Sequence, residues 1–402
     1  DLKSNLTYLI SFLILMSFSL TAEKLNTDSL KANLPGNFNG QIAIKKNTQF
    51  IFNENIGYKE QTYGTEINDS TLFNVGEISH TFIHYFIKHL VKLRQINISE
   101  PVNKYLVDFP YDSIQIKHLV NHQSGLPKDY IRLYHKKVFN NMDIKAKDKE
   151  KLFDNDDILF LLSRVKPQLL FKPGDSIAYS NIDYLLLVSL IEKVTFTPFP
   201  DFVAKIFKHH NFVFTPLVSI LDTIPNKAMG YRLFEDETTG LFENLSSYGF
   251  NYDDGTTGNQ HLYLSAKNLA LWAQFIFNDI DFGYIKANPS KYFMGGIKYN
   301  KQLEVTEKEG GFGGTYTKII FIPENGIIAV VISNIYTGEK LDKLVSYLKL
   351  IDEWFYQLLG QDISPTLLGD QAFDLFWDFL PLPSHSENRK TRIRCESTKA
   401  SL

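Results

Sequence analysis

The feature that most constrains the fold of this sequence is the order of its strand-like and helix-like segments. Near the start, residues 40–46 and 49–52 alternate as strands do, with a turn at 46–48, and the pattern continues at 55–58. Near the end, antiparallel strands are predicted at 292–299, 302–305, 316–322 and 327–334, the last two joined by a tight hairpin at 323–326. Strands at both ends with helices between them imply one sheet built from both ends, with a helical insertion. The sequence therefore predicts an α+β fold in which helices flank an antiparallel sheet.

Helix-like periodicity is clearest between residues 79 and 93. Apolar side chains there recur at intervals of three and four, which gives one buried helical face: Phe82, Ile83, Phe86, Ile87, Leu90 and Val91. Further helices are predicted at 116–122, 184–194, 202–207, 266–277 and 340–359. The polar, irregular stretch 136–154 is predicted to be a loop.

The length of 402 residues is enough for two domains, or for one domain with a large insertion. We expect a sheet subdomain formed by residues 23–97 together with 290–360, and a mostly helical inserted subdomain at 98–289. Residues 361–402 lose their hydrophobic pattern and are predicted to be a disordered tail.

The first 22 residues resemble a secretory signal peptide. Lys3 precedes an apolar run at 6–20, and a small residue, Ala22, follows it. The alternative is a membrane anchor, but the run is short for a span of about twenty residues. We expect export to the periplasm or the medium, with membrane contact only through an uncleaved signal.

Composition excludes several classes of function. A net charge of -3 gives no electrostatic basis for nucleic-acid binding, and the one basic run, at 389–394, is interpreted as a solvated part of the tail. The single cysteine, Cys395, allows no intrachain disulfide and argues against a cysteine-based metal site or a catalytic thiol. No feature indicates a cofactor, and the oligomeric state stays open.

A candidate site lies at residues 73–82, which read FNVGEISHTF. Here an irregular polar segment gives way to the helix that begins at residue 79. A glycine before a helix and a charged residue in its first turn suit an active site, because the backbone N–H groups at a helix start are unpaired and favour negative charge.

Five segments, in this order, resemble segments of one family: FNVGEISHTF at 73–82, PVNKYL at 101–106, IKHLVNHQSGLP at 116–127, FKPGDSIAYSN at 171–181 and KEGG at 308–311. The family is that of the serine β-lactamase and penicillin-binding-protein-like hydrolases, especially the branch of class C β-lactamases and D-alanyl-D-alanine carboxypeptidases. The resemblance covers residues 38 to 356. It implies the family's fold, an antiparallel sheet with flanking helices.

The resemblance also implies a catalytic centre. The family has a nucleophilic serine in the first turn of a helix and a lysine three residues later, on the same helix face. This sequence has Glu77 at the serine position and His80 at the lysine position. By the same resemblance, the backbone N–H groups of Glu77 and Gly311 would form the oxyanion hole.

Two further motifs keep the family's residue types more closely. Tyr179 resembles the tyrosine that shuttles a proton, and Asn181 resembles the asparagine that contacts the substrate amide. Lys308 and Gly310 resemble the strand motif that binds a substrate carboxylate, although this branch often has histidine in place of the lysine. Asn181, Gly310 and Gly311 are the predicted substrate-binding residues.

His118 and His122 lie four residues apart on a predicted helix, a spacing that zinc sites use. No glutamate stands beside the first histidine, and no third ligand is obvious. The family resemblance explains His122 as a structural residue before the Ser124-Gly125 turn. We predict no metal site.

The substituted centre predicts a catalytically inactive protein, a pseudoenzyme. An acyl group on Glu77 would form an anhydride, and loss of the serine costs a triad hydrolase on the order of a millionfold in turnover. His80 would be largely neutral near pH 7 and could not replace a permanent cation beside Tyr179. Glu77 would lie within reach of Lys308, would repel a ligand carboxylate and could occupy that anion site itself. The expected role is binding of a cell-wall peptide, a small amide or ester ligand, or a partner; a decaying gene product would look the same.

An active enzyme is the alternative. Glu77 and His80 lie on one predicted helix face, and they could activate water beside Tyr179 and Lys308 to hydrolyse an ester, an amide or a D-amino-acid peptide. A third interpretation, an interaction module with an aromatic surface, has no sequence feature of its own.

Overall fold

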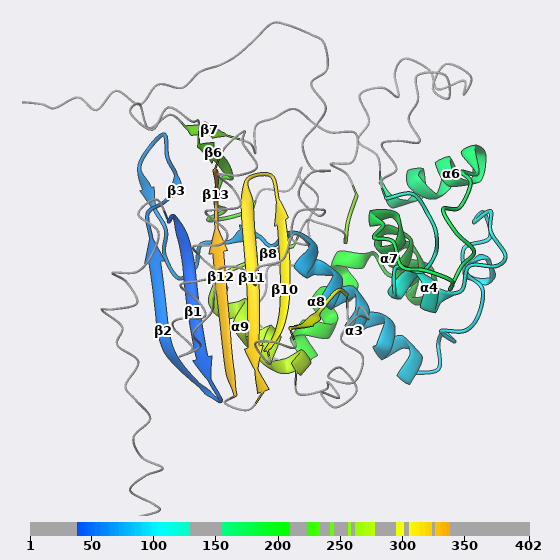
Figure 1. Ribbon diagram of the computed structural model, residues 1–402, viewed down its shortest axis with the longest axis horizontal. Coiled ribbons are helices and arrows are strands. Elements are labelled where there is room, and N and C mark those ends of the chain that lie inside the picture. The colour runs from blue at the N-terminus through cyan, green and yellow to red at the C-terminus, as the bar shows by residue number, and fades with distance from the viewer. Residues whose placement is uncertain are drawn as a thin grey trace, which may run out of the picture. The chain divides into compact units, whose positions relative to one another are not determined.

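The structure is a computed structural model, and it describes residues 38–128, 154–209, 224–233, 242–244, 256–258, 262–277, 295–300, 305–323 and 326–337. In this part of the chain the main feature is a six-stranded sheet in the order β2-β1-β12-β11-β10-β9 (Figure 1). All of its neighbouring strands are antiparallel. The bounds are Gly40–Lys46 for β1, Gln49–Ile56 for β2, Lys298–Asn300 for β9, Val305–Phe312 for β10, Thr315–Ile322 for β11 and Ile327–Ser333 for β12. The sheet therefore joins strands from the two ends of the sequence, as predicted.

The central strands of this sheet are buried on both faces. All seven side chains of β12 are buried, and all those of β1 except Lys46. Such strands read as continuous apolar runs rather than alternating ones, as IIAVVIS does in β12. β1 and β12 pair directly, with Ile42 opposite Val331.

Six α-helices are described: α3 (Ser79–Lys92), α4 (Ile116–Val120), α6 (Asn155–Val165), α7 (Asn181–Thr195), α8 (Phe199–His209) and α9 (Ala266–Phe277). α9 packs across one face of the sheet, against β1 and β12 (Figure 1). α7 is buried from residue 181 to residue 191 and contacts α3, α4, α6 and α8. One hydrophobic core joins side chains of these helices to the face of the sheet that α9 covers.

Short strands make three smaller sheets. β3 (Tyr58–Glu60) pairs with β4 (Thr65–Glu66), and β5 (Phe73–Asn74) pairs with β8 (Tyr263–Leu264). β6 (Tyr231–Leu233) lies between β7 (Phe242–Asn244) and β13 (Ile335–Thr337). It is antiparallel to β7 and parallel to β13. The strand pattern predicted at 55–58 does not form one strand: β2 ends at Ile56, and Gly57, with φ of +78°, turns the chain toward β3.

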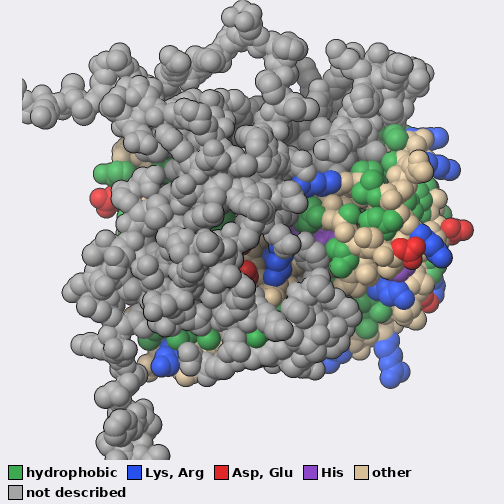
Figure 2. Space-filling view, viewed as in Figure 1, with side chains coloured by type: hydrophobic (Ala, Val, Ile, Leu, Met, Phe, Trp, Pro, Cys, Tyr) green, Lys and Arg blue, Asp and Glu red, His purple; other side chains and the backbone are tan. Residues whose placement is uncertain are grey.

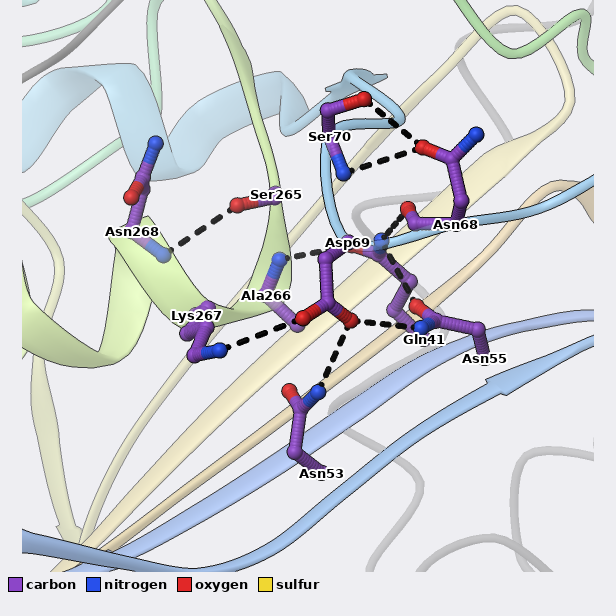
Figure 3. Close-up of polar contacts among 10 residues, drawn as sticks. All are labelled: Gln41, Asn53, Asn55, Asn68, Asp69, Ser70, Ser265, Ala266, Lys267 and Asn268. Carbon is purple, nitrogen blue, oxygen red and sulfur yellow. Dashed lines mark hydrogen bonds and ion pairs between the residues drawn. The ribbon is translucent and has the colours of Figure 1, made fainter.

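A buried polar contact joins the sheet to the segment before the candidate site. Gln41 of β1 is 3% exposed; its Nε2 donates to the Asn68 carbonyl at 2.7 Å and to Asn55 Oδ1 at 3.0 Å. Its Oε1 accepts from the Ala266 N–H, at the start of α9, at 2.9 Å. Around it, Asp69 accepts hydrogen bonds from Asn53 and Asn55 and pairs with Lys267 (Figure 3). One glutamine thus fixes α9 and the 66–71 segment to the sheet.

The predicted helices at 79–93, 116–122, 184–194, 202–207 and 266–277 are confirmed, with limits that differ by up to three residues. The predicted signal (1–22), the closing helix (340–359), the tail (361–402) and all but the last residue of the 136–154 loop lie outside the described residues. The limits of the two subdomains stay predictions. Of the helices that the structure describes, none combines the length and the apolar character that crossing a membrane requires.

Candidate active site

The start of α3 lies directly against strand β10 (Figure 1). A 3-10 turn, Gly76–Ile78, leads into the helix. A Cβ atom on Gly76 would lie 2.3 Å from the Gly311 nitrogen, and one on Gly310 would lie 2.5 Å from the Val75 carbonyl oxygen. Gly76 also has φ of +53°, which glycine adopts without strain. Glycines on both elements therefore allow the two backbones to touch.

Glu77 is in the first turn of this helix start and is 4% exposed. Its Oε2 accepts a hydrogen bond from the Gly311 N–H of β10 at 2.8 Å. The partial positive charge of a helix N-terminus also favours a carboxylate here. The side chain of Glu77 is thus held across the junction of α3 and β10.

Lys308 lies two residues before Gly310 on β10, so its side chain is on the same strand face, toward the helix start. It is 8% exposed, and burial lowers its pKa to about 8. The Glu77 carboxylate acts in the opposite direction and favours the ammonium form. Glu77 and Lys308 therefore interact electrostatically inside the site.

His80 is fully buried and packs flat against Tyr184 of α7, with ring centroids 3.8 Å apart and planes 8° apart. The rings of His122 and Tyr179 lie 5.8 and 5.9 Å from it. His80 is thus part of an aromatic cluster between α3 and α7.

Tyr179 belongs to the same cluster. Its hydroxyl donates to Asn181 Oδ1 at 2.6 Å, and its ring lies 4.8 Å from that of His122. The Lys128 ammonium is 5.9 Å from the ring centroid. Asn181 is the first residue of α7 and is 6% exposed.

Asp183 was missed by the sequence analysis. It is fully buried on α7, where Oδ2 lies 3.0 Å from His122 Nδ1 and Oδ1 accepts from the Ser124 hydroxyl at 2.6 Å. The signal was an acid within an apolar stretch, Ile182-Asp183-Tyr184-Leu185, because such an acid needs a polar partner. Its partner lies 61 residues earlier in the chain.

His118 and His122 make separate contacts. His118 Nδ1 accepts from the Gln115 N–H at 3.1 Å, at the start of α4, whereas His122 contacts Asp183. Within the described ranges, no three His, Cys, Asp or Glu side chains are grouped so that they could hold a metal ion.

The structure thus brings the predicted site residues into two groups. Glu77, Lys308, Gly310 and Gly311 meet where α3 begins, and His80, Tyr179 and Asn181 meet with His122 beside α7. Near the centre of the view, Figure 2 shows basic, acidic and histidine side chains of the described residues. Such a site offers a held carboxylate, a buried ammonium and a phenol.

Comparisons with known proteins agree with this architecture. Residues 35–211 match the Beta-lactamase family. The D-amino acid amidase of Ochrobactrum anthropi SV3, solved with D-phenylalanine, has the same fold, with a TM-score of 0.64 over 83% of this chain and 99% of that chain at 18% identity. These matches support the resemblance to the serine β-lactamase and penicillin-binding-protein-like family, and the family model covers less than half of the chain. They agree with the family resemblance of the sequence motifs and confirm the predicted fold.

Two curated relatives in this family match part of the chain. Penicillin-binding protein 4* of Bacillus subtilis is 30% identical over 166 residues, which cover 41% of this chain and 35% of the relative. Teichoic acid D-alanine hydrolase of Staphylococcus aureus is 29% identical over 175 residues, which cover 42% of this chain and 44% of the relative. The matches thus span less than half the length of these two relatives. The assignment of Glu77 and His80 to the family's serine and lysine positions stays a prediction.

Proposed function

We propose that this chain binds its ligand without forming an acyl-enzyme, as a pseudoenzyme of the family. One observation carries the proposal: Glu77 Oε2 accepts the hydrogen bond of the Gly311 N–H, at 2.8 Å, inside a buried site. The motif assignment makes this N–H a donor of the oxyanion hole, which in active members holds the substrate carbonyl oxygen. A carboxylate held there competes with the carbonyl oxygen for the same donor.

The chemistry of a carboxylate nucleophile supports the same proposal. Attack of Glu77 on an ester or amide would form a mixed anhydride, which is far less stable than a serine ester. Removal of the nucleophilic serine lowers the turnover of a triad hydrolase by about a millionfold. The Oε2 atom of Glu77 accepts the hydrogen bond of the Gly311 N–H, and this contact does not make the carboxylate a better nucleophile.

The environment of His80 also argues against formation of an acyl-enzyme. The ring is buried in a stack with Tyr184 at 3.8 Å. Imidazole is not a permanent cation at neutral pH, so it does not supply the charge that a lysine would place beside Tyr179. Without a permanent cation beside it, the phenolate form of Tyr179 is less favoured, and the hydroxyl serves as a hydrogen-bonding group.

The relatives suggest the class of ligand. One is named for hydrolysis of D-alanine from teichoic acid and another for amidase action on D-amino acids. We infer a small D-amino-acid ester or amide, or a cell-wall peptide, as the ligand. The cell-wall setting of such ligands also supports export, in agreement with the signal expected at residues 1–22.

Ligand-observed NMR with D-alanine methyl ester and D-phenylalanine amide tests the proposal. The expected result is saturation transfer to at least one of the two compounds with no hydrolysis beyond that of the buffer. Asn181→Ala should weaken the transfer, because Asn181 is the predicted contact to the substrate amide. Absence of transfer to both compounds would contradict the proposed ligand class.

The same experiment separates the alternative, in which Glu77 and His80 activate water. That mechanism requires hydrolysis by the native protein and its loss in Glu77→Gln, which keeps the shape of the side chain but removes the base. Hydrolysis with that dependence would overturn the proposal of a pseudoenzyme.

A further inference from the structure

The segment around Tyr179 is fastened to residues 122–128 by backbone contacts on both sides. The Ala178 N–H donates to the His122 carbonyl at 2.9 Å, and the Asn181 N–H donates to the Lys128 carbonyl at 2.8 Å. The Ser180 hydroxyl donates to the Pro127 carbonyl at 2.7 Å. Tyr179 stands between these contacts, so its position depends on the 122–128 segment.

His122 contacts the segment around Tyr179 through both its backbone and its side chain. It has φ of +52°, a conformation that L residues adopt rarely, and its side chain is 1% exposed. Its Nδ1 lies 3.0 Å from Asp183 Oδ2, whereas the Ser180 N–H lies farther from the same nitrogen, at 3.4 Å. The shorter contact to a buried carboxylate is the stronger one, because charge-assisted hydrogen bonds dominate where water is excluded.

Asp183 is fully buried, and burial raises the pKa of its carboxyl; contacts with His122 and Ser124 act in the opposite direction. A carboxylate at this depth is stable only if N–H and O–H donors satisfy it. The Ser124 hydroxyl supplies one donor at 2.6 Å. A proton on His122 Nδ1 would supply the other.

We propose that Asp183 and His122 are positioning residues for Tyr179: the buried carboxylate keeps the His122 proton on Nδ1, so that Nε2 of the same ring is an acceptor within the cluster that holds the phenol. The aspartate of a catalytic triad fixes a histidine tautomer in the same physical way. The groups that surround Tyr179 are then His80 from α3, His122, Lys128 above the ring, and Asn181, which accepts its hydroxyl proton.

This inference deepens the proposed function in one respect: an Nε2 without a proton offers no donor to the Tyr179 oxygen and so does not favour the phenolate, which suits binding rather than proton transfer. It does not depend on whether the native protein acylates. The two claims are therefore tested by different measurements.

The test is the tautomer of His122, read from the ¹⁵N shifts of the ring nitrogens in histidine-labelled native protein, with His122→Gln for assignment. We expect a protonated Nδ1 in the native protein and in Ser124→Ala, the matched control that removes the other contact of Asp183. In Asp183→Asn, the amide N–H can donate to Nδ1, so the proton should move to Nε2. The Tyr179 phenol, followed by its ¹³Cζ shift with Tyr179→Phe for assignment, should then ionise at a pH about one unit lower.

A native His122 protonated on Nε2 would overturn the proposal, and this measurement needs no folded variant of Asp183. A tautomer unchanged in Asp183→Asn would also overturn it. So would a changed tautomer with an unshifted Tyr179, because Asp183 and His122 would then be structural only.

Discussion

At the scale of single residues, the candidate site buries opposite charges beside each other. Glu77 is 4% exposed and Lys308 is 8% exposed. A buried charge is costly unless it has an opposite charge or hydrogen-bond donors, and removal of one partner leaves the other uncompensated. Here the Gly311 N–H and Lys308 both favour the ionised form of Glu77, while Glu77 favours the ammonium of Lys308. The charge state of each residue therefore depends on the other.

Burial of Lys308 predicts a specific pH dependence of stability. Its pKa falls from 10.5 to about 8 in the folded chain. Between those values the unfolded chain binds a proton that the folded chain does not, so the free energy of unfolding rises with pH. Relative to Lys308→Met, the native protein should gain up to about 3 kcal/mol as the pH is raised through this window.

Urea unfolding of both proteins at several pH values measures this difference. A difference in the free energy of unfolding that stays constant across the window would show that Lys308 titrates as an exposed lysine.

At the scale of elements, the site depends on the close approach of strand β10 to the start of α3. A Cβ atom on Gly310 would lie 2.5 Å from the Val75 carbonyl oxygen and 2.8 Å from the Ile78 nitrogen, so there is no room for one. The Glu77–Gly311 hydrogen bond requires the same approach. A side chain at this junction would separate the two elements.

Gly310→Ala should therefore destabilise the fold by about 1–3 kcal/mol through overpacking. It should also shift the amide resonances of residues 75–80. Gly313→Ala is the matched control on the adjoining turn: φ is +56°, but nothing lies within 4 Å of the added Cβ. Gly313→Ala should lower the free energy of unfolding by about 1 kcal/mol through backbone strain. The amide resonances of residues 75–80 should stay where they are in the native protein. Equal shifts at 75–80 in both variants would contradict the proposed contact.

The contact of Gln41 makes a second prediction at this scale. Gln41→Leu removes the partner of the buried Ala266 N–H, and also those of the Asn68 carbonyl and Asn55 Oδ1, whose contacts are partly buried (Figure 3). A buried polar group without its partner costs about 1–3 kcal/mol. We expect a loss of at least that size in urea unfolding.

Lys267→Met is the comparison for Gln41→Leu. Lys267 and Asp69 form an ion pair with side chains 40% and 52% exposed. Such pairs contribute about 0–1 kcal/mol. If both variants lose the same stability, the buried glutamine does not hold α9 to the sheet.

At the scale of the whole molecule, local patterns predicted most of the elements but not the contacts between them. The strands expected at 292–299 and 302–305 are misplaced, since β9 is Lys298–Asn300 and β10 is Val305–Phe312. α9 begins and ends where the apolar spacing at 266–277 indicated, and the sheet joins both ends of the chain as expected. β5 and β8 have two residues each, too few to show a period. The bond from Gly311 to Glu77 joins residues 234 positions apart, and no local spacing carries that information. The motifs could name site residues, but only the fold shows which side chains meet.

The central claim is that the native chain does not form an acyl-enzyme, because Glu77 stands where a nucleophile is needed and holds a donor of the oxyanion hole. Incubation with a fluorescent penicillin followed by intact-protein mass spectrometry tests it directly. Glu77→Ser combined with His80→Lys supplies the positive control, since Tyr179, Asn181 and Lys308 are already present. The same pair of substitutions with Tyr179→Phe controls for labelling outside the site.

We predict no mass increase for the native protein. Glu77→Ser/His80→Lys should gain one penicilloyl group, and the triple variant should lose most of that reaction. A stoichiometric adduct on the native protein, formed at the site and competed by unlabelled penicillin, would contradict the account.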